Sequence, residues 1–336
     1  MTDTPSARRL SQPELFRPPL TYPSMPFGDR LTRAVHLYPE NEAIVFKDLS
    51  LTFREVEGLT NAFAHALRAL GIRQGDRVCL LMTNRPEYAI AFFALARLGA
   101  VASPMNPSYK EREIAYQIED SQAVAVVVQN DLLPLVEAVR GGLTRLEHVI
   151  AVGPGRPAAG SDALHFAELV ARHPATPITD VEIAEGDLLA LPYSSGTTGL
   201  PKGVLLSHKA FGWNNLQFIA VNRVTERDRF MVFLPFYHIY GLMLMGGALL
   251  SGSTLVLMER FEPVECCRLV EQHQITLFFA VPPVLAMLSA WPEIGTYDFT
   301  SVRHCMVGAA PVPPEVARRF REVTGIRVVQ GYGLTE

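Results

Sequence analysis

Hydrophobic positions along the chain alternate between two kinds of spacing from about residue 52 to residue 330. In Thr52–Leu70 the apolar side chains recur every three or four residues, which is the pattern of an amphipathic helix. Short continuous apolar runs such as Val78–Met82 and Ala123–Val128 are typical of strands that are buried on both faces. Helices that alternate with buried strands predict an α/β fold built on mainly parallel sheets.

Proline near helix starts and glycine just after helix ends define the predicted boundaries. The predicted helices are Thr52–Leu70, Glu87–Leu98, Lys110–Asp120, Leu132–Val139, Pro263–His273, Pro282–Ala290 and Pro314–Thr324. The predicted strands are Val78–Met82, Ala100–Ser103, Ala123–Val128, His148–Val152, Leu188–Tyr193, Thr254–Met258, Thr276–Val281, Val302–Val307 and Arg327–Gln330. Residues 1–28 are rich in proline and serine and predict an extended lead-in, and a helical pattern starts at Leu31.

Composition limits the classes of function. The chain has 336 residues, of which 49% are hydrophobic and 19% charged, so a large core is expected. A net charge of -4 gives no electrostatic reason to expect nucleic acid as a partner. Four cysteines without a CxxC pair indicate reduced thiols, and with no signal peptide at Met1–Leu10 they predict a cytoplasmic protein.

The longest stretch without charged side chains is Phe230–Met258. Its length would suit a membrane span, but one proline and several glycines interrupt it. We therefore expect a strand, a loop, a buried helix and a second strand there, and no transmembrane segment. Peripheral contact with a membrane stays open.

The most specific segment is YSSGTTGLPKGV, from Tyr193 to Val204, which follows an apolar strand. Its glycines allow backbone N–H groups to approach an anion, and its hydroxyls donate hydrogen bonds to phosphate oxygens. Lys202 adds a positive charge. The segment lacks the Gly-Lys-Ser/Thr ending of a Walker loop, so it predicts a different kind of phosphate-binding loop.

This loop resembles the signature loop of the adenylate-forming (AMP-binding) superfamily, and its variant is most similar to that of acyl-CoA synthetases and 4-coumarate–CoA ligases. The resemblance implies that the loop surrounds the β- and γ-phosphates of ATP. The implied nucleotide-binding residues in the loop are Ser194, Ser195, Gly196, Thr197, Thr198, Gly199 and Lys202.

Three further segments resemble family motifs and occur in the family's order: LPFYHIYG (234–241), VGAAP (307–311) and QGYGLTE (330–336). The first implies that His238 lines the acyl pocket. The second implies that adenine and the acyl group lie against Gly308, Ala309 and Ala310. In the third, Tyr332 and Gly333 would contact adenine, Thr335 the α-phosphate, and Glu336 a magnesium ion. The implied catalytic residues are Lys202, His238, Thr335 and Glu336.

The resemblance also implies the architecture: the large N-terminal domain of these enzymes, with two α/β subdomains and mostly parallel sheets in an αβαβα arrangement. Residues 76–205 would form the first subdomain, and residues 29–75 with 206–336 the second. The family's later motifs do not follow Glu336, among them the ribose-binding aspartate and the lysine of the small C-terminal domain. We therefore expect the C-terminal barrel subdomain and lid domain to be absent, and this chain to be a fragment with little turnover alone.

The implied function is ATP-dependent activation of a carboxylic acid to an acyl-adenylate and then to an acyl-CoA thioester. ATP, Mg²⁺ and CoA would be required. A Met-rich apolar stretch at Leu242–Gly247 suits a fatty or aryl acid. Two alternatives stay open: an adenylation domain that loads a carrier protein, and a non-catalytic protein that binds nucleotide or acyl groups.

Overall fold

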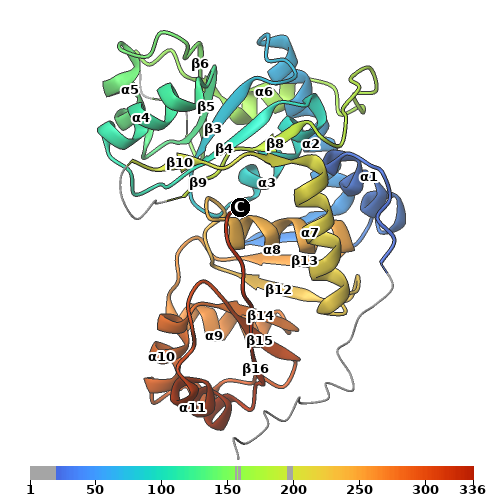
Figure 1. The fold of residues 1–336 in the computed structure, drawn as a ribbon, viewed down its shortest axis with the longest axis vertical. Helices are drawn as coiled ribbons and strands as arrows, with labels where there is room; N and C mark the ends of the chain where they lie inside the picture. Colours follow the sequence, from blue (N-terminus) through green and yellow to red (C-terminus); the bar gives the residue numbers. More distant parts are fainter. Residues whose placement is uncertain (1–19, 156, 158–159, 195–199) are drawn as a thin grey trace, which may run out of the picture.

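A computed structural model describes residues 20–155, 157, 160–194 and 200–336. In these residues the strands form two seven-stranded sheets and one two-stranded hairpin (Figure 1). Parallel pairing dominates both sheets, and an antiparallel strand lies at one edge of each. The α/β architecture predicted from the alternating pattern is confirmed.

The first sheet contains most of the strands between residues 77 and 207. Its strands, in spatial order, are β11 (Leu206–Ser207), β8 (Leu188–Ala190), β4 (Val101–Met105), β3 (Arg77–Leu81), β5 (Ala125–Gln129), β6 (His148–Val152) and β7 (Leu164–His165). Successive side chains of β3 point to opposite faces, so Val78 and Leu80 join the central core while Cys79 and Leu81 join a second core. Both faces are thus covered, which explains the continuous apolar runs.

The second sheet combines strands from the two ends of the chain. Its order is β16 (Val328–Gln330), β15 (His304–Val307), β14 (Leu277–Ala280), β12 (Arg229–Val232), β13 (Thr254–Leu257), β1 (Glu42–Phe46) and β2 (Leu49–Thr52). The hairpin β1–β2 was not among the predicted strands. Only its inner strand β1 is buried, so its sequence lacks the long apolar run that marks the other strands.

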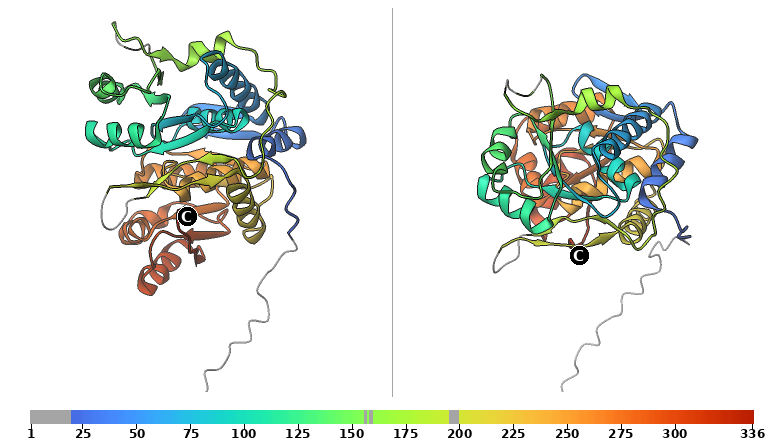
Figure 2. Two further views of the ribbon diagram at one scale, coloured as in Figure 1. Left: turned by 45° about the horizontal axis from the view of Figure 1, so that its top comes forward. Right: turned by 90° about the horizontal axis from the view of Figure 1, so that it is seen from above.

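Helices cover the sheets in three layers (Figures 1 and 2). The helices are α1 (Phe27–Leu37), α2 (Phe53–Ala69), α3 (Pro86–Leu98), α4 (Glu111–Ser121), α5 (Leu133–Arg140), α6 (Phe166–Arg172), α7 (His208–Val221), α8 (Ile239–Ser251), α9 (Pro263–Gln272), α10 (Pro282–Ala290) and α11 (Pro314–Thr324). Helices α4 and α5 lie on the outer face of the first sheet, and α9, α10 and α11 on the outer face of the second. Helices α1, α2, α3, α7 and α8 lie between the sheets or beside them, which completes the αβαβα arrangement.

The central layer is the most enclosed part of the molecule. Every residue of α3 except Glu87 is buried. Arg97 of α3 forms a buried ion pair with Glu57 of α2 and hydrogen bonds to Asn61 and, at 3.0 Å, to Thr32 of α1. A guanidinium in this position is stable because its donors meet acceptors from two neighbouring helices.

Two predicted boundaries need correction. The lead-in predicted for residues 1–28 overlaps α1, which begins at Phe27. The strand predicted at Leu188–Tyr193 is divided into β8 and β9 (Tyr193–Ser194), and β9 pairs with β10 (Lys202–Gly203) instead of continuing the sheet. Pro192 lies at the division, and a proline has no N–H with which to continue a central ladder.

The charge-free stretch that begins at Phe230 folds as expected into β12, a loop, the buried helix α8 and β13. None of the helices in the described part of the chain is both long and apolar enough to span a membrane. The predicted subdomain limits stay a prediction; β11 lies just after residue 205 and pairs with β8 of the first sheet.

Helix α7 is attached to the start of α1 through a buried histidine. The backbone N–H of Phe27 donates a hydrogen bond of 3.1 Å to Nδ1 of His208, the first residue of α7. Burial lowers the pKa of His208 to about 4, and nearby Asp187 opposes only part of this effect. A proton on Nδ1 would remove the acceptor and place a charge in the core.

We therefore expect the free energy of unfolding to decrease as the pH falls from about 6.5 to about 4. In this interval the unfolded chain binds a proton at His208 that the folded chain excludes, so the contribution is complete above pH 6.5. Urea unfolding at several pH values measures this slope. His208→Gln, which retains an acceptor but does not titrate, should flatten it; an unchanged slope in that variant would contradict the assignment to His208.

Candidate functional site

The carboxyl ends of β15 and β16 and the start of α8 meet around a cavity of about 290 Å³. Its lining residues come from α7, the α8 start, β15 and the C-terminal segment: Asn214, Gln217, Phe218, Val221, Asn222, His238, Ile239, Tyr240, Met243, Met306, Gly308, Ala309, Gly331, Tyr332, Gly333 and Leu334. Ligand sites in open α/β sheets commonly lie at the carboxyl ends of strands. Five residues singled out from the sequence are in this set: His238, Gly308, Ala309, Tyr332 and Gly333.

His238 is the N-cap residue of α8. Its Nδ1 accepts a hydrogen bond of 3.3 Å from the backbone N–H of Tyr240, and burial lowers the pKa of the imidazole. The neutral ring therefore faces the cavity near neutral pH. Gly241 follows in the first turn of α8, where a Cβ atom would lie 2.2 Å from the carbonyl oxygen of Pro235. This glycine allows the loop before α8 to pass close to the helix.

The rim formed by residues 308–310 has little side-chain bulk. Gly308 lies against the ring of Tyr240, and a Cβ at Gly308 would approach that ring to 3.0 Å. Ala309 has a φ of +69°, in the left-handed region that residues with a Cβ seldom adopt. Strain of this kind is concentrated at ligand sites, where the surrounding structure enforces it. Ala310, the last residue of this rim, is exposed and does not line the cavity.

Two hydrogen bonds hold the rim against the C-terminal segment. The N–H of Gly331 donates to the carbonyl of Val307 at 2.8 Å, and the N–H of Val312 donates to Oε1 of Gln330 at 3.2 Å. The side chain of Tyr332 stays free of the core and is 91% exposed. An aromatic face beside a rim of small residues is suited to a flat ligand such as a nucleobase.

Tyr240 was not among the predicted site residues, although it lies two positions after His238. Its hydroxyl donates a hydrogen bond of 3.1 Å to the carbonyl of Met306, and burial raises the pKa of the phenol well above its usual range. Tyr240 therefore connects α8 to β15 across the base of the cavity. Tyr240 is an aromatic residue of the motif 234–241, close to the predicted site residue His238. That position in the motif was the signal that could have identified it.

The hairpin β9–β10 carries the predicted phosphate-binding residues Ser194 and Lys202, which pair across it. The hydroxyl of Tyr193 donates a hydrogen bond of 2.6 Å to Asp120, and the hydroxyl of Tyr116 donates one of 2.9 Å to the carbonyl of Pro201. Helix α4 thus fixes both strands of the hairpin. Burial and the Asp120 carboxylate raise the pKa of Tyr193, which keeps this donor protonated.

Lys202 is exposed, and its side chain makes no ion pair or hydrogen bond with another residue in the described ranges. The other predicted loop residues, Ser195, Gly196, Thr197, Thr198 and Gly199, lie outside the described residues. Lys202 and Ser194 do not line the cavity.

Thr335 and Glu336 also lie outside the cavity lining. The C-terminal end of the chain lies close to the hairpin β9–β10 in the views of Figures 1 and 2. In the described part of the chain, no cluster of three or more His, Cys, Asp or Glu residues could hold a metal ion.

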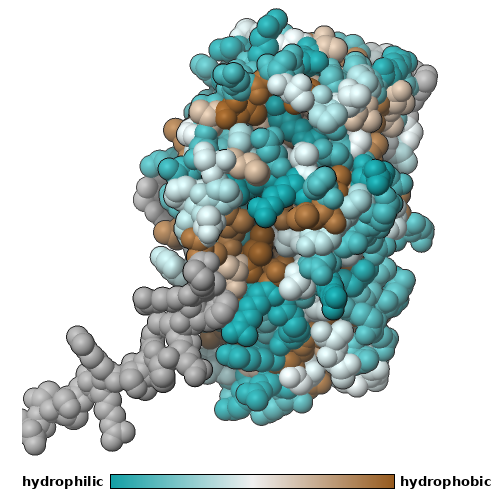
Figure 3. Space-filling model, turned by 90° about the vertical axis from the view of Figure 1, so that its right-hand side faces the viewer, coloured by the Kyte–Doolittle hydropathy of each residue, from teal (hydrophilic) through white to brown (hydrophobic). Residues whose placement is uncertain are grey.

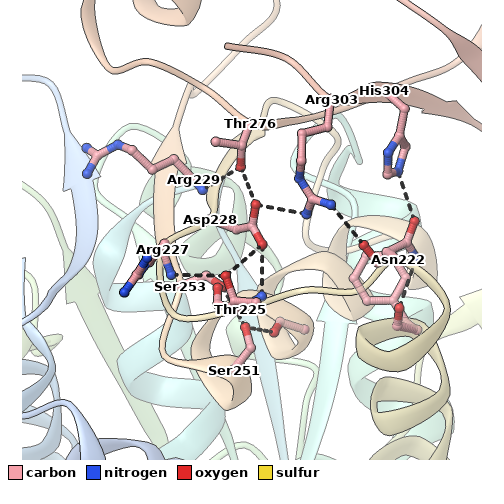
Figure 4. A network of polar contacts seen from close by, with 12 residues as sticks. Asn222, Thr225, Arg227, Asp228, Arg229, Ser251, Ser253, Thr276, Arg303 and His304 are labelled. Atoms are coloured by element: carbon pink, nitrogen blue, oxygen red, sulfur yellow. Dashed lines mark hydrogen bonds and ion pairs between the residues drawn. The ribbon is translucent and has the colours of Figure 1, made fainter. Parts of the chain in front are cut away.

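The C-terminal end of α7 is held by a network of polar contacts (Figure 4). Asp228, with a side chain only 7% exposed, accepts hydrogen bonds from the N–H of Thr225 at 2.8 Å, from Thr276 at 2.6 Å and from Arg303 at 2.8 Å. His304 contacts Oδ1 of Asn222 at 3.1 Å. Asn222 is the residue directly after α7, and it lines the cavity. The network therefore fixes the C-terminal end of the cavity wall that α7 provides.

Comparisons with known proteins agree with this geometry. The family model described as AMP-binding enzyme matches residues 31–336. A 4-coumarate–CoA ligase of Humulus lupulus is 35% identical over an alignment of 302 positions that covers 88% of this chain and 53% of that protein. A long-chain-fatty-acid–CoA ligase of Bacillus subtilis is 29% identical over an alignment of 348 positions, gaps included, that covers 94% of this chain and 61% of that protein. The chain thus spans between one half and two thirds of the length of these relatives.

Two solved structures also match most of this chain. An anthranilate CoA ligase, AuaEII, crystallised with anthranoyl-AMP, matches with a TM-score of 0.88 and 29% identity, over 94% of this chain and 61% of that one. The N-terminal domain of FACL13 from Mycobacterium tuberculosis matches with a TM-score of 0.82 and 29% identity, over 93% of this chain and 76% of that one.

Proposed function

Because the chain belongs to the AMP-binding enzyme family, we propose that it binds ATP and a carboxylic acid and forms the acyl-adenylate, as a step towards an acyl-CoA thioester. The observation that carries this proposal is the cavity in which His238, the small rim residues Gly308 and Ala309, and Tyr332 meet. The motif 234–241, which contains the start of α8, and the motif 307–311, more than 60 positions later, both contribute to its lining. The coumarate and fatty-acid ligases among the relatives support a carboxylic acid as substrate.

In the first step the acid's carboxylate oxygen attacks the α-phosphorus of ATP. A bond forms between that oxygen and the α-phosphorus, the bond from the α-phosphorus to the bridging oxygen breaks, and pyrophosphate leaves with the electron pair. The protein's part in such a transfer is positioning and stabilisation of charge. Lys202, with Ser194, Ser195, Gly196, Thr197, Thr198 and Gly199, would bind the departing phosphates; Thr335 would orient the α-phosphate.

The adenine would lie between Tyr332 and the rim, where Gly308, Ala309 and Gly333 leave space for a planar ring. Ala310 would extend this rim. The acyl group would enter the cavity beside His238, whose low pKa keeps the ring uncharged next to an apolar ligand. Only a neutral imidazole can lie against such a group without the cost of a buried charge.

Mg²⁺ would be held by Glu336 and the phosphates. The donor set fits this ion, which commonly binds one or two carboxylates together with the phosphates of a substrate. Glu336 is exposed and has no ion-pair partner in the described residues. When bound, the ion would neutralise charge on the phosphates. CoA would be the acceptor whose thiol attacks the acyl carbonyl and releases AMP.

The proposal predicts saturable binding of an acyl-adenylate mimic. Titration of the chain with N-acyl-sulfamoyl adenosine derivatives of an aryl and a fatty acid, followed by calorimetry, should give one site per chain. ATP should compete for this site, and the free acid should bind much more weakly because it lacks the adenosine contacts. A folded chain that binds none of these compounds would exclude the proposed function.

A further inference from the structure

The loop that carries His238 is held by a residue next to the first sheet. This loop, residues 233–238, connects β12 to α8 in the second half of the chain. Asn84 lies in the turn between β3 and α3, and only 2% of it is exposed. Its Nδ2 donates a hydrogen bond of 3.0 Å to the carbonyl of Leu234, and its Oδ1 accepts one of 2.8 Å from the N–H of Phe236. One buried carboxamide thus binds the loop backbone at two points.

These two bonds fix the orientation of the Asn84 carboxamide. A backbone carbonyl can only accept a hydrogen bond and a backbone N–H can only donate one, so the nitrogen must face Leu234 and the oxygen must face Phe236. A rotated amide would place acceptor against acceptor and donor against donor, which is costly for a side chain away from water. Asn84 therefore holds the loop in one position.

Tyr88 in the first turn of α3 binds the same part of the loop. Its hydroxyl donates a hydrogen bond of 3.3 Å to the carbonyl of Phe236, and the two rings pack at a centroid distance of 5.3 Å. Helix α3 lies between the sheets, and Figure 3 shows apolar side chains gathered at about this level, halfway along the side on which α1 and α7 lie. Both aromatic residues are buried, so water cannot replace a lost bond between them.

The loop separates two cavities. His238 lines the cavity of about 290 Å³ described above, whereas Pro235 and Tyr237 line another of about 400 Å³. Side chains that border open space have few neighbours on that side and contribute little to fixing the backbone. Of residues 235–238 only Phe236 is buried. The contacts of Phe236 are therefore what holds this turn between the cavities.

A shift at Phe236 would move His238 as well, because one tight turn connects them. The N–H of His238 donates a hydrogen bond of 3.0 Å to the carbonyl of Pro235. Directly afterwards, Nδ1 of His238 accepts from the N–H of Tyr240 and caps α8. Gly241 packs on the same carbonyl of Pro235, so the turn has no free space towards the helix.

We propose that Asn84 is a positioning residue for the acyl part of the ligand: by holding the loop 233–238, it places the His238 ring against the acyl group. Loss of its two bonds should then weaken the contribution of the acyl group to binding. The contribution of the nucleotide should stay, because the rim 308–310 and Tyr332 belong to other segments. This inference rests on the proposed function, because it requires the acyl group to lie beside His238.

The test separates the acyl contribution from the nucleotide contribution. Benzoyl- and decanoyl-sulfamoyl-adenosine and the parent 5′-O-sulfamoyladenosine, which has no acyl group, are titrated into the chain by calorimetry. The ratio between the dissociation constants of the parent compound and of the tighter mimic measures the acyl contribution. Asn84→Ala should reduce this ratio about three- to tenfold, the range of one close ring contact. Affinity for the parent compound should stay within about twofold.

Tyr88→Phe keeps the ring against Phe236 and removes only the bond to its carbonyl. It should reduce the ratio by a smaller factor, and it remains a test if Asn84→Ala does not fold. Asn61→Ala is the matched control. Asn61 is also a buried carboxamide that bonds at both ends, to the carbonyl of Ala175 and to Arg97, but it lies on α2 and does not contact the loop. Its replacement should lower the unfolding temperature and leave the ratio unchanged.

A double variant shows whether Asn84 acts through the imidazole. Asn84→Ala combined with His238→Ala should have the same ratio as His238→Ala alone, because a ring that is absent cannot be misplaced. The inference fails if Asn84→Ala leaves the ratio intact, if it weakens the parent compound equally, or if the double variant loses more than His238→Ala. Wild-type chain that binds neither mimic, or binds both no more tightly than the parent compound, would instead overturn the acyl site of the proposed function and this inference with it.

Discussion

Replacement of Lys202 by methionine should weaken the binding of Mg·ATP to this chain about ten- to hundredfold. We propose that its ammonium binds the ATP phosphates, and a hydrogen bond between charged groups contributes roughly 1.5–3 kcal/mol. Lys202 is exposed on a hairpin that Tyr193–Asp120 and Tyr116–Pro201 fix to α4, so the charge is presented from a rigid support. Methionine keeps most of the side-chain length and removes only the charge.

Calorimetric titration with Mg·ATP measures this effect, and Lys47→Met is the matched control. Lys47 is also an exposed lysine, but it lies in the turn after β1 in the other sheet and pairs with Glu259 at 3.0 Å. Its replacement should change the ATP affinity less than about twofold, because Lys47 is remote from the hairpin. Loss of its ion pair should change the stability of the fold by only about 0–1 kcal/mol, as is usual for surface pairs. Equal losses in the two variants would mean that Lys202 acts through net charge alone.

Gly241→Ala should lower the free energy of unfolding by about 3 kcal/mol, at the upper end of the range for overpacking in a core. The added Cβ would lie 2.2 Å from the carbonyl oxygen of Pro235 and 2.6 Å from that of Leu234. Both contacts are with backbone, so a rotamer change cannot relieve them. The loop that carries His238 must shift instead, and affinity for acyl-adenylate mimics should fall together with stability.

Urea unfolding of the variant and of Gly295→Ala tests this prediction. A Cβ at Gly295 has no neighbour within 4 Å, so this control should stay within about 0.5 kcal/mol of the wild type, as surface substitutions usually do. A stable Gly241→Ala variant with unchanged mimic affinity would show that the loop before α8 adapts more easily than its backbone contacts indicate.

Several features of the site followed directly from the order of residues. The loop 193–204 and the motifs at His238, 308–310 and 332–336 each carry side chains suited to one part of a nucleotide or its acyl partner. Their chemistry is local, because glycine, hydroxyl and lysine act within a few residues of one another. The mainly parallel sheets with both faces covered were likewise visible, since a strand covered on both faces must be apolar at every position; the αβαβα arrangement followed from the resemblance.

Helix α7 shows why the rest could not be predicted. Its buried face includes His208, Gly212 and Asn215 besides two phenylalanines, so no apolar stripe marks it in the sequence. His208 and Gly212 face Phe27 and Arg30 of α1. Asn215 is buried because the closely packed helix α8 presents Gly246 to it: a Cβ on Gly246 would lie 2.6 Å from Oδ1 of Asn215. That fit depends on two helices and is encoded in neither alone.

The sequence by itself determined the sheet architecture, the family motifs and most of the residues that we propose to meet a nucleotide, because periodicity and short motifs are properties of neighbouring positions. Only the tertiary structure decided which residues line the cavity. Tyr240 reaches Met306 across 66 positions, and Tyr22 reaches Gln217 across 195. Such contacts arise from the packing of α1, α7, α8 and the second sheet around one cavity, and no local pattern specifies them.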